Sequence, residues 1–208
     1  MLVKKFSKNI KKDIKLSNYS WFNLGGPAEF FFKPENKSQL IEFIKFQQTN
    51  NFKITILGAG SNTLVRDKGV KGVVIKLGSE FSKIRLVNNE IIEAGAAALD
   101  KKISNFSKDN CLGNLEFLSC IPGSIGGAVI MNSGCYDNDI SKVLHSINVI
   151  NIKNCEEREI KKSEINFFYR GTNLSKEFLI TSVKLKGKLS SKKIKKKKQS
   201  ELIEKKKN

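Results

Sequence analysis

The sequence predicts an α+β protein of two lobes, and three observations lead to this fold class. The chain of 208 residues suits one large or two small domains, with 39% hydrophobic residues to form a core. Before Gly78, short apolar runs typical of strands flank one segment with helical spacing of its apolar residues; after Gly78, paired apolar runs indicate a β-hairpin. Lysine then dominates the end of the chain. We expect lobe 1 at 1–78, lobe 2 at 79–187 and a basic connector helix at 188–208.

The first lobe has the pattern of a small α/β unit. A Gly-Gly-Pro turn at 25–27 precedes an aromatic run, which predicts a strand. Apolar residues then recur at helical spacing from Leu40 to Phe46, and Ser38 is the expected N-cap of that helix. Two later apolar runs are too short for helices and predict buried strands. The expected elements are strands at 28–32, 54–57 and 72–77 and a helix ending near Asn50.

The second lobe has the pattern of a mixed or antiparallel sheet. Asn88-Asn89 separates two apolar runs and predicts a hairpin turn. A helical stretch and a glycine-rich segment follow, and the short spacing of the later apolar runs favours antiparallel pairing. The expected elements are a hairpin at 84–94, a helix at 97–108 and strands at 143–152, 158–160 and 178–186.

The net charge of +18 is concentrated at the end of the chain. Residues 184–208 hold 12 lysines and two glutamates, a net charge of +10 and more than half of the excess. A solvated surface explains this better than a nucleic-acid site, because lysine dominates rather than arginine and aromatic clusters. No run approaches 18 apolar residues and the N-terminus lacks a secretory pattern. We expect a cytoplasmic monomer that binds a small molecule, without nucleic-acid or membrane partners.

The cysteine and histidine content limits the chemistry. The four cysteines contain no C-x-x-C pair, so we expect reduced thiols rather than metal ligands. His145 is the only histidine, which argues against nucleophiles activated by histidine and against multi-histidine metal sites. No metal is expected.

Two glycine-rich turns form the candidate cofactor site. The first follows a predicted strand, and its glycines would let backbone N–H groups form a nest for a phosphate. Thr63 stands where a Rossmann fingerprint has its third glycine, so that motif does not apply. A purely structural tight turn is the alternative. The candidate residues are Gly58, Ala59, Gly60, Ser61, Asn62 and Thr63.

The second turn lies in lobe 2. It combines a Pro-Gly turn, a serine able to cap a helix, and glycines that allow a planar ligand or a diphosphate to approach the backbone. A close-packed helix start is the alternative. Because one such turn occurs in each lobe, we expect a cofactor between them. The candidate residues are Ile121, Pro122, Gly123, Ser124, Gly126, Gly127 and, further along, Asn132.

A phenol and a guanidinium stand together near the end of lobe 2. Tyr169 and Arg170 follow an aromatic pair and precede Gly171, a turn signal. A fixed cation there would stabilise negative charge that develops on a carboxylate or an enolate. An arginine whose aliphatic stem packs at a strand end is the alternative.

Five motifs together resemble the UDP-N-acetylenolpyruvoylglucosamine reductase family, also called UDP-N-acetylmuramate dehydrogenases, over almost the whole chain. They are WFNLGGPA at 21–28, LGAGSN at 57–62, LEFL at 115–118 with IPGSIGGA at 121–128, MNSGCY at 131–136 and FYR at 168–170. The resemblance implies an FAD-binding fold of the vanillyl-alcohol-oxidase (PCMH) type. By the same resemblance, the first turn holds the FAD diphosphate and the second lies along the flavin.

The resemblance also implies a reaction in peptidoglycan precursor synthesis, and thus a part in cell wall biogenesis, cell shape and cell division. NADPH would reduce the flavin, and hydride would pass to UDP-N-acetylglucosamine-enolpyruvate. The resulting enolate would be protonated to UDP-N-acetylmuramate. Arg170 would be the catalytic residue that stabilises the enolate, and Tyr169 would lie beside the substrate.

The chain departs from the family pattern in three places. Family members carry a C-terminal substrate domain, with a serine that protonates the enolate and a late glutamate, and neither motif occurs before Asn208. We therefore expect the FAD-binding portion, ending within the connector. Asn23 stands where a basic residue is usual, and Asp137 where glycine is usual. The alternatives are another FAD-dependent sugar or alcohol oxidoreductase and a basic module that binds RNA or another anion.

Overall fold

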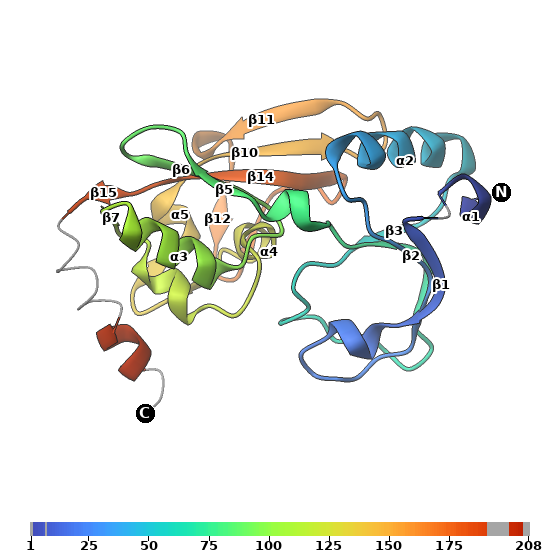
Figure 1. Cartoon of the computed structure of the whole chain (residues 1–208), viewed down its shortest axis with the longest axis horizontal. Coiled ribbons are helices and arrows are strands. Elements are labelled where there is room, and N and C mark those ends of the chain that lie inside the picture. Colours follow the sequence, from blue (N-terminus) through green and yellow to red (C-terminus); the bar gives the residue numbers. More distant parts are fainter. Residues whose placement is uncertain (1, 7, 191–199, 206–208) are drawn as a thin grey trace.

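The computed structural model describes residues 2–6, 8–190 and 200–205. They form two main β-sheets that lie side by side, with helices packed against each (Figure 1). The expected α+β class is confirmed. Within these ranges, no helix combines the length and the apolar character needed to cross a membrane.

Lobe 1 is built on a four-stranded sheet in the order β1-β2-β4-β3. β1 pairs with β2 antiparallel, whereas β2 and β3 both pair with β4 in parallel. Helix α2 packs on this sheet, where the rings of Phe43 and Phe32 lie 4.4 Å apart between centroids. The elements are α1 (Leu2–Lys5), β1 (Ile10–Lys15), η1 (Leu16–Tyr19), β2 (Pro27–Phe32), α2 (Lys37–Asn50), β3 (Ile54–Ile56), β4 (Val70–Ile75) and η2 (Ser79–Ser82).

The three strands and the helix expected in lobe 1 are present, with two corrections. Asn36 has an extended backbone and its side chain accepts a hydrogen bond from the N–H of Gln39, so Asn36 is the N-cap of α2 and the prediction of Ser38 is wrong. β3 lies at the edge of the sheet and Ile56 is 43% exposed, so the expected burial of that strand is also wrong. Asn51 ends α2 in the left-handed conformation, close to the predicted end.

Lobe 2 is built on a five-stranded sheet, antiparallel throughout, in the order β11-β10-β14-β6-β5. The predicted hairpin and the three later strands are confirmed. Side chains of β6, β14, α3 and α4 form one buried core on one face of this sheet. The elements are β5 (Ile84–Leu86), β6 (Ile91–Gly95), α3 (Asp100–Asp109), β7 (Leu112–Gly113), η3 (Glu116–Cys120), α4 (Ile125–Ile130), β8 (Gly134–Cys135), β9 (Asn138–Asp139), α5 (Ile140–Val143), β10 (Leu144–Asn151), β11 (Glu157–Lys161), η4 (Lys162–Glu164), β12 (Phe167–Phe168), β13 (Gly171–Thr172), β14 (Phe178–Lys186) and β15 (Lys188–Leu189).

Helix α3 begins three residues later than expected, at Asp100. The backbone before the helix pairs with the second glycine-rich turn instead. The carbonyl of Ala96 accepts a hydrogen bond from the N–H of Gly126, and the carbonyl of Ala98 accepts one from the N–H of Ile125, both at 2.9 Å. This pairing holds the second glycine-rich turn against the end of β6. The same residues therefore cannot also start a helix.

The two lobes share an apolar core. Ile150 of β10 and Leu179 of β14 are buried in the same cluster as Phe32 and Phe43 of lobe 1. Burial of these side chains holds the lobes together and so sets the positions of the turns that each lobe contributes. The boundary between residues 78 and 79 stays a prediction.

The expected connector helix is wrong at its start. Lys188–Leu189 forms strand β15, which pairs antiparallel with β7. Residues 200–205 are helical. The rest of that prediction falls on 191–199 and 206–208, which lie outside the described residues.

Candidate functional site

The first glycine-rich turn leaves the carboxyl end of β3 and is held at both ends. The N–H of Leu57 donates to the carbonyl of Ile75 at 2.9 Å, and the carbonyl of Gly60 accepts from the N–H of Trp21 at 3.0 Å. Gly60 has φ of 75°, and a Cβ there would collide with the carbonyl oxygen of Tyr19. A glycine is therefore required at this position by close backbone packing.

The backbone N–H groups of this turn are free. From Gly58 to Thr63, none donates a hydrogen bond to any acceptor in the described part of the chain. Gly58 and Asn62 are exposed and Ala59, Ser61 and Thr63 are partly exposed, so most of these groups lie at an accessible surface. Consecutive N–H groups without protein acceptors are suited to bind an anion such as a phosphate.

The second turn is fixed by the segment that precedes α3. Besides the bonds of Ala96 and Ala98, the N–H of Asp100 donates to the carbonyl of Gly123 at 3.2 Å. The N–H groups of Gly123, Ser124 and Gly127 have no acceptor in the described ranges. Ser124 occupies the N-cap position of α4 as predicted, but its side chain makes no cap hydrogen bond. Its hydroxyl is thus not used to complete the helix.

The two turns face each other across the junction of the lobes. A Cβ built on Gly58 would lie 2.9 Å from Oγ of Ser124, and one built on Gly123 would lie 3.6 Å from Oγ of Ser61. Each turn therefore presents a glycine to a serine of the other. The expectation that the turns lie opposite each other is confirmed, and a side chain at Gly58 would intrude between them.

Lys76 places a positive charge beside the first turn, and it is not among the residues predicted from the sequence. Its Nζ donates to the carbonyl of Gly58 and lies 5.9 Å from the ring centroid of Tyr19. Burial, with a smaller contribution from the charge of Lys33, lowers the pKa of Lys76. A signal was present: β3 and β4 are parallel, so the residues that follow them meet at one edge of the sheet.

Asp100 is a second residue at these turns that is not among those predicted from the sequence. Its side chain is fully buried, and neither carboxyl oxygen has a hydrogen-bond partner. Burial raises the pKa of this carboxyl to about 8. A Cβ built on Gly123 would lie 3.0 Å from Oδ2 of Asp100, so the carboxyl group packs directly against the second turn.

Tyr169 and Arg170 form the two-residue turn of the hairpin β12-β13. Both are exposed, Tyr169 to 88%, and the guanidinium lies 5.4 Å from the phenol ring centroid. Nη1 of Arg170 also donates to the carbonyl of Gly134 at 3.4 Å. The side chain is therefore not inserted among apolar residues, and its charge is accessible to a ligand.

Asn132 holds this hairpin next to α4. Its Nδ2 donates to the carbonyl of Phe168 at 3.3 Å, while its Oδ1 accepts from the N–H of Ser141 at 3.0 Å. The hydroxyl of Thr172 donates to the carbonyl of Ile130 at the end of α4. Asn132 thus positions Arg170 relative to the second turn, and the direct contact with cofactor expected for it stays a prediction.

The structure accounts for the unusual residue at Asp137. Tyr136 and Asp137 have φ of 50° and 60°, as in a type I′ turn, and they connect β8 to β9. This conformation is readily adopted by glycine, which explains the residue usual there in the family that the sequence resembles.

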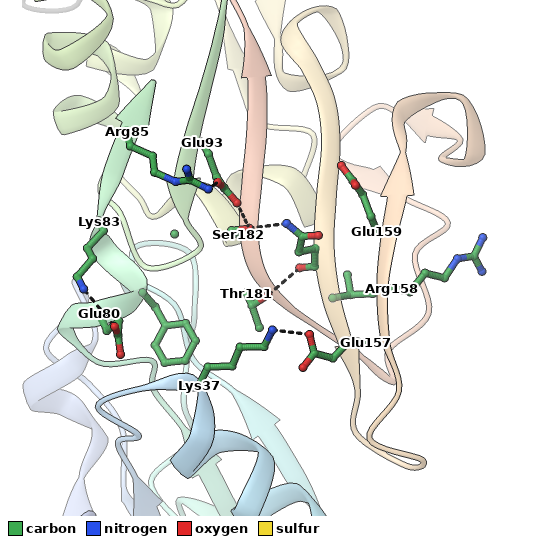
Figure 2. A pocket seen from close by; sticks show the side chains of 14 residues that line it. Lys37, Glu80, Lys83, Arg85, Glu93, Glu157, Arg158, Glu159, Thr181 and Ser182 are labelled. Atoms are coloured by element: carbon green, nitrogen blue, oxygen red, sulfur yellow. Dashed lines mark hydrogen bonds and ion pairs between the residues drawn. The ribbon is translucent and has the colours of Figure 1, made fainter. Parts of the chain in front are cut away.

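A charged groove lies elsewhere on the molecule and includes none of the predicted site residues. It has a volume of about 720 Å³ and lies on the face of the five-stranded sheet opposite the lobe 2 core, beside α2 (Figure 2). Its ionic side chains largely pair with each other, as in Lys37 with Glu157, Lys83 with Glu80 and Arg85 with Glu93. A charged ligand would have to break these pairs, so the glycine-rich turns are the better candidate.

Comparison with known proteins agrees with this geometry. The family described as FAD binding domain matches residues 28–159, which is more than half of the chain. The chain belongs to this FAD-binding domain family. Its turns fit the cofactor, because free N–H groups and a lysine meet at a surface that a Cβ at Gly58 would obstruct.

The relatives of this FAD-binding domain are longer proteins. The UDP-N-acetylenolpyruvoylglucosamine reductase of Pelagibacter ubique is 44% identical to this chain, and the match covers 89% of this chain and 62% of the relative. The protein of the same name from Rickettsia akari is 39% identical, and the match covers 85% of this chain and 59% of the relative. The chain thus spans about 60% of the length of these curated relatives.

Solved structures show the same fold. The crystal structure of UDP-N-acetylenolpyruvylglucosamine reductase from Thermus caldophilus has a TM-score of 0.83 at 28% identity, covering 95% of this chain and 70% of that one. Cholesterol oxidase from Brevibacterium sterolicum has a TM-score of 0.60 at 13% identity, and the match covers 86% of this chain and 37% of the cholesterol oxidase chain. At this identity the likeness shows a shared fold alone. The predicted two-lobed FAD-binding fold is confirmed.

Proposed function

We propose that this chain is the FAD-binding portion of a UDP-N-acetylenolpyruvoylglucosamine reductase and that its two glycine-rich turns hold the FAD diphosphate. The observation that carries the proposal is the run of free N–H groups from Gly58 to Thr63, set opposite the free N–H groups of the second turn. The relatives' names and the shared fold support the assignment.

Each turn has a distinct part in this proposal. The N–H groups of the first turn donate to phosphate oxygens, and Lys76 adds a positive charge next to them. In the second turn, Gly123, Ser124 and Gly127 offer further donors, and Gly127, where a Cβ would meet only Oγ of Ser124 at 3.9 Å, lets a planar ring approach the backbone. Gly126 instead packs inside lobe 2, because a Cβ there would lie 2.9 Å from Cβ of Ala96. The adjoining hollow lined by Ile56, Leu57, Thr63, Leu64, Val65 and Val70 is mainly apolar and suits the adenine base.

The proposed reaction reduces the enolpyruvyl group of UDP-N-acetylglucosamine-enolpyruvate to the lactyl ether of UDP-N-acetylmuramate, with NADPH as the electron donor. Bound FAD supplies the ring that accepts and then donates hydride. Arg170 is the proposed catalytic residue, because its exposed guanidinium can stabilise the negative charge of the substrate carboxylate and of the enolate. Tyr169, next to it on the hairpin, is proposed to contact the substrate. A cytoplasmic monomer without nucleic-acid or membrane partners stays a prediction.

Two lysine variants test where FAD binds. Lys76→Ala removes the charge beside the first turn, whereas Lys37→Ala removes one from the groove of Figure 2. We expect Lys76→Ala to weaken FAD binding about fivefold, which corresponds to about 1 kcal/mol, and Lys37→Ala to leave it unchanged. Titration of the purified chain with FAD, followed by flavin fluorescence, measures both. A loss confined to Lys37→Ala would place the ligand in the groove and contradict the proposal.

A further inference from the structure

Lys76 has the surroundings of a reactive lysine. Its side chain is partly buried, and it forms a hydrogen bond with the carbonyl of Gly58 but no ion pair with any carboxylate of the described residues. Burial, together with the charge of Lys33, lowers its pKa. A larger fraction of Lys76 is therefore the free amine, which is the nucleophilic form, than of an exposed lysine.

The contacts of Lys76 leave that amine able to react. A neutral amine has two N–H groups and one lone pair, so it can donate to the carbonyl of Gly58 while the lone pair stays available. The ring of Tyr19, whose centroid lies 5.9 Å from Nζ, flanks the side chain. These contacts place the nucleophile at the first residue of the first glycine-rich turn.

The same turn offers a binding site for the phosphate of an electrophile. Its N–H groups, from Gly58 to Thr63, have no acceptor in the described part of the chain and are suited to bind a phosphate. In an acyl phosphate, the reactive acyl carbon is joined to the phosphate through a single oxygen. A phosphate held by the turn therefore brings this carbon toward Nζ of Lys76, and such proximity accelerates a reaction.

We propose that Lys76 is a site of acylation by acyl phosphates, which bind through their phosphate to the first glycine-rich turn. This proposal rests on the phosphate-binding role that the proposed function gives to the turn. The lone pair of Nζ attacks the acyl carbon, the bond from that carbon to the phosphate oxygen breaks, and inorganic phosphate leaves with the proton that the nitrogen releases. The product is an uncharged amide, and no further reactant is needed.

The modification and the cofactor exclude each other. Bound FAD occupies the N–H groups that would hold the acyl phosphate, so it protects Lys76. Conversely, the amide carries no positive charge beside the turn, so the modified chain should bind FAD as weakly as Lys76→Ala.

The test measures acetylation of the full chain by acetyl phosphate without FAD, followed by mass spectrometry of its peptides. Lys12 is the matched control: it is exposed, its Nζ lies 5.5 Å from the ring centroid of Phe30, and β1 is at the opposite edge of the sheet from β3. N-acetoxysuccinimide, an acetyl donor without phosphate, measures the intrinsic reactivity of both amines. The ratio of the Lys76 rate to the Lys12 rate should be at least about fivefold higher with acetyl phosphate, as one hydrogen bond to the phosphate would produce.

Two further measurements test the site and the consequence. FAD and inorganic pyrophosphate should each slow the acetylation of Lys76 by acetyl phosphate and leave that of Lys12 unchanged. Treatment with acetyl phosphate should then weaken FAD binding about fivefold in the wild type. In Lys76→Arg, whose guanidinium is not acetylated, the same treatment should leave the affinity of the variant where it was before treatment.

The outcomes separate this inference from the function on which it rests. Equal rate ratios with the two reagents, or no protection by pyrophosphate, in a chain that binds FAD would overturn the acylation site and leave the FAD site standing. Selective, pyrophosphate-sensitive acetylation of Lys76 in a chain that binds no FAD would support the acylation site and overturn the proposed function. A folded chain with neither property would overturn both.

Discussion

Replacing Asp100 by asparagine should make the stability of the protein less dependent on pH. Burial raises the pKa of this carboxyl from 3.8 to about 8 in the folded chain. Between these values the unfolded chain has released the proton that the folded chain still holds. The folded state binds more protons, so the free energy of unfolding falls as the pH rises through this window.

The size of the effect follows from the shift. Each pH unit within the window changes the contribution by about 1.36 kcal/mol. About 3 pH units separate the ordinary pKa of 3.8 from pH 7. At pH 7 the free energy of unfolding of the wild type is therefore about 4 kcal/mol lower than at low pH, as far as Asp100 is concerned. Asparagine has nearly the same shape and does not titrate. The difference in stability between the variant and the wild type should therefore grow steadily in favour of the variant from pH 4 to pH 8.

Urea unfolding of both proteins at several pH values measures this difference. If the asparagine amide packs less well than the carboxyl, the difference in free energy of unfolding changes by the same amount at every pH. The contributions of the other titrating groups are the same in both proteins and cancel. The slope alone therefore reports on Asp100. A difference that stays constant from pH 4 to pH 8 would show that the carboxyl is ionised in the folded protein, and would refute the reasoning.

Three further substitutions test other parts of the structure. Asn36→Ala should destabilise the chain by about 1 kcal/mol in urea unfolding because it removes the N-cap of α2, whereas Ser38→Ala should change stability little; equal effects would contradict the assigned cap. Asp137→Gly should stabilise the chain by up to about 1 kcal/mol, because φ is 60° there and glycine adopts this conformation readily; a lower melting temperature in the variant would contradict that turn geometry. Arg170→Ala should leave FAD affinity within about twofold, because the residue lies on an exposed hairpin, and a large loss would move Arg170 from a substrate role to cofactor binding.

Local patterns predicted most of the elements correctly because they depend on neighbouring residues. The hairpin of β5 and β6 follows from two apolar runs around Asn88-Asn89, and the strand β2 follows from the turn before it. The two glycine-rich turns were found in the same way. Their position opposite each other agrees with the expectation that a cofactor lies between the lobes.

The errors arise where tertiary contacts decide. Asn36 and Ser38 are both suitable caps, and the backbone path from β2 selects Asn36. The start of α3 is delayed because residues 96–99 pair with the second turn. Lys76 and Asp100 were missed because their importance depends on which strand and which turn lie beside them, and single lysines and aspartates are common in any sequence.

The central claim is that free backbone N–H groups of the two turns bind the diphosphate of FAD. Its most direct test is titration of the purified chain with FAD and, in parallel, with riboflavin, which has the same ring system but neither the diphosphate nor the adenosine. The account predicts roughly one FAD per chain, bound at least about 100-fold more tightly than riboflavin, as two charge-assisted hydrogen bonds would produce. Equal affinity for the two flavins, or a folded chain that binds neither, would contradict it.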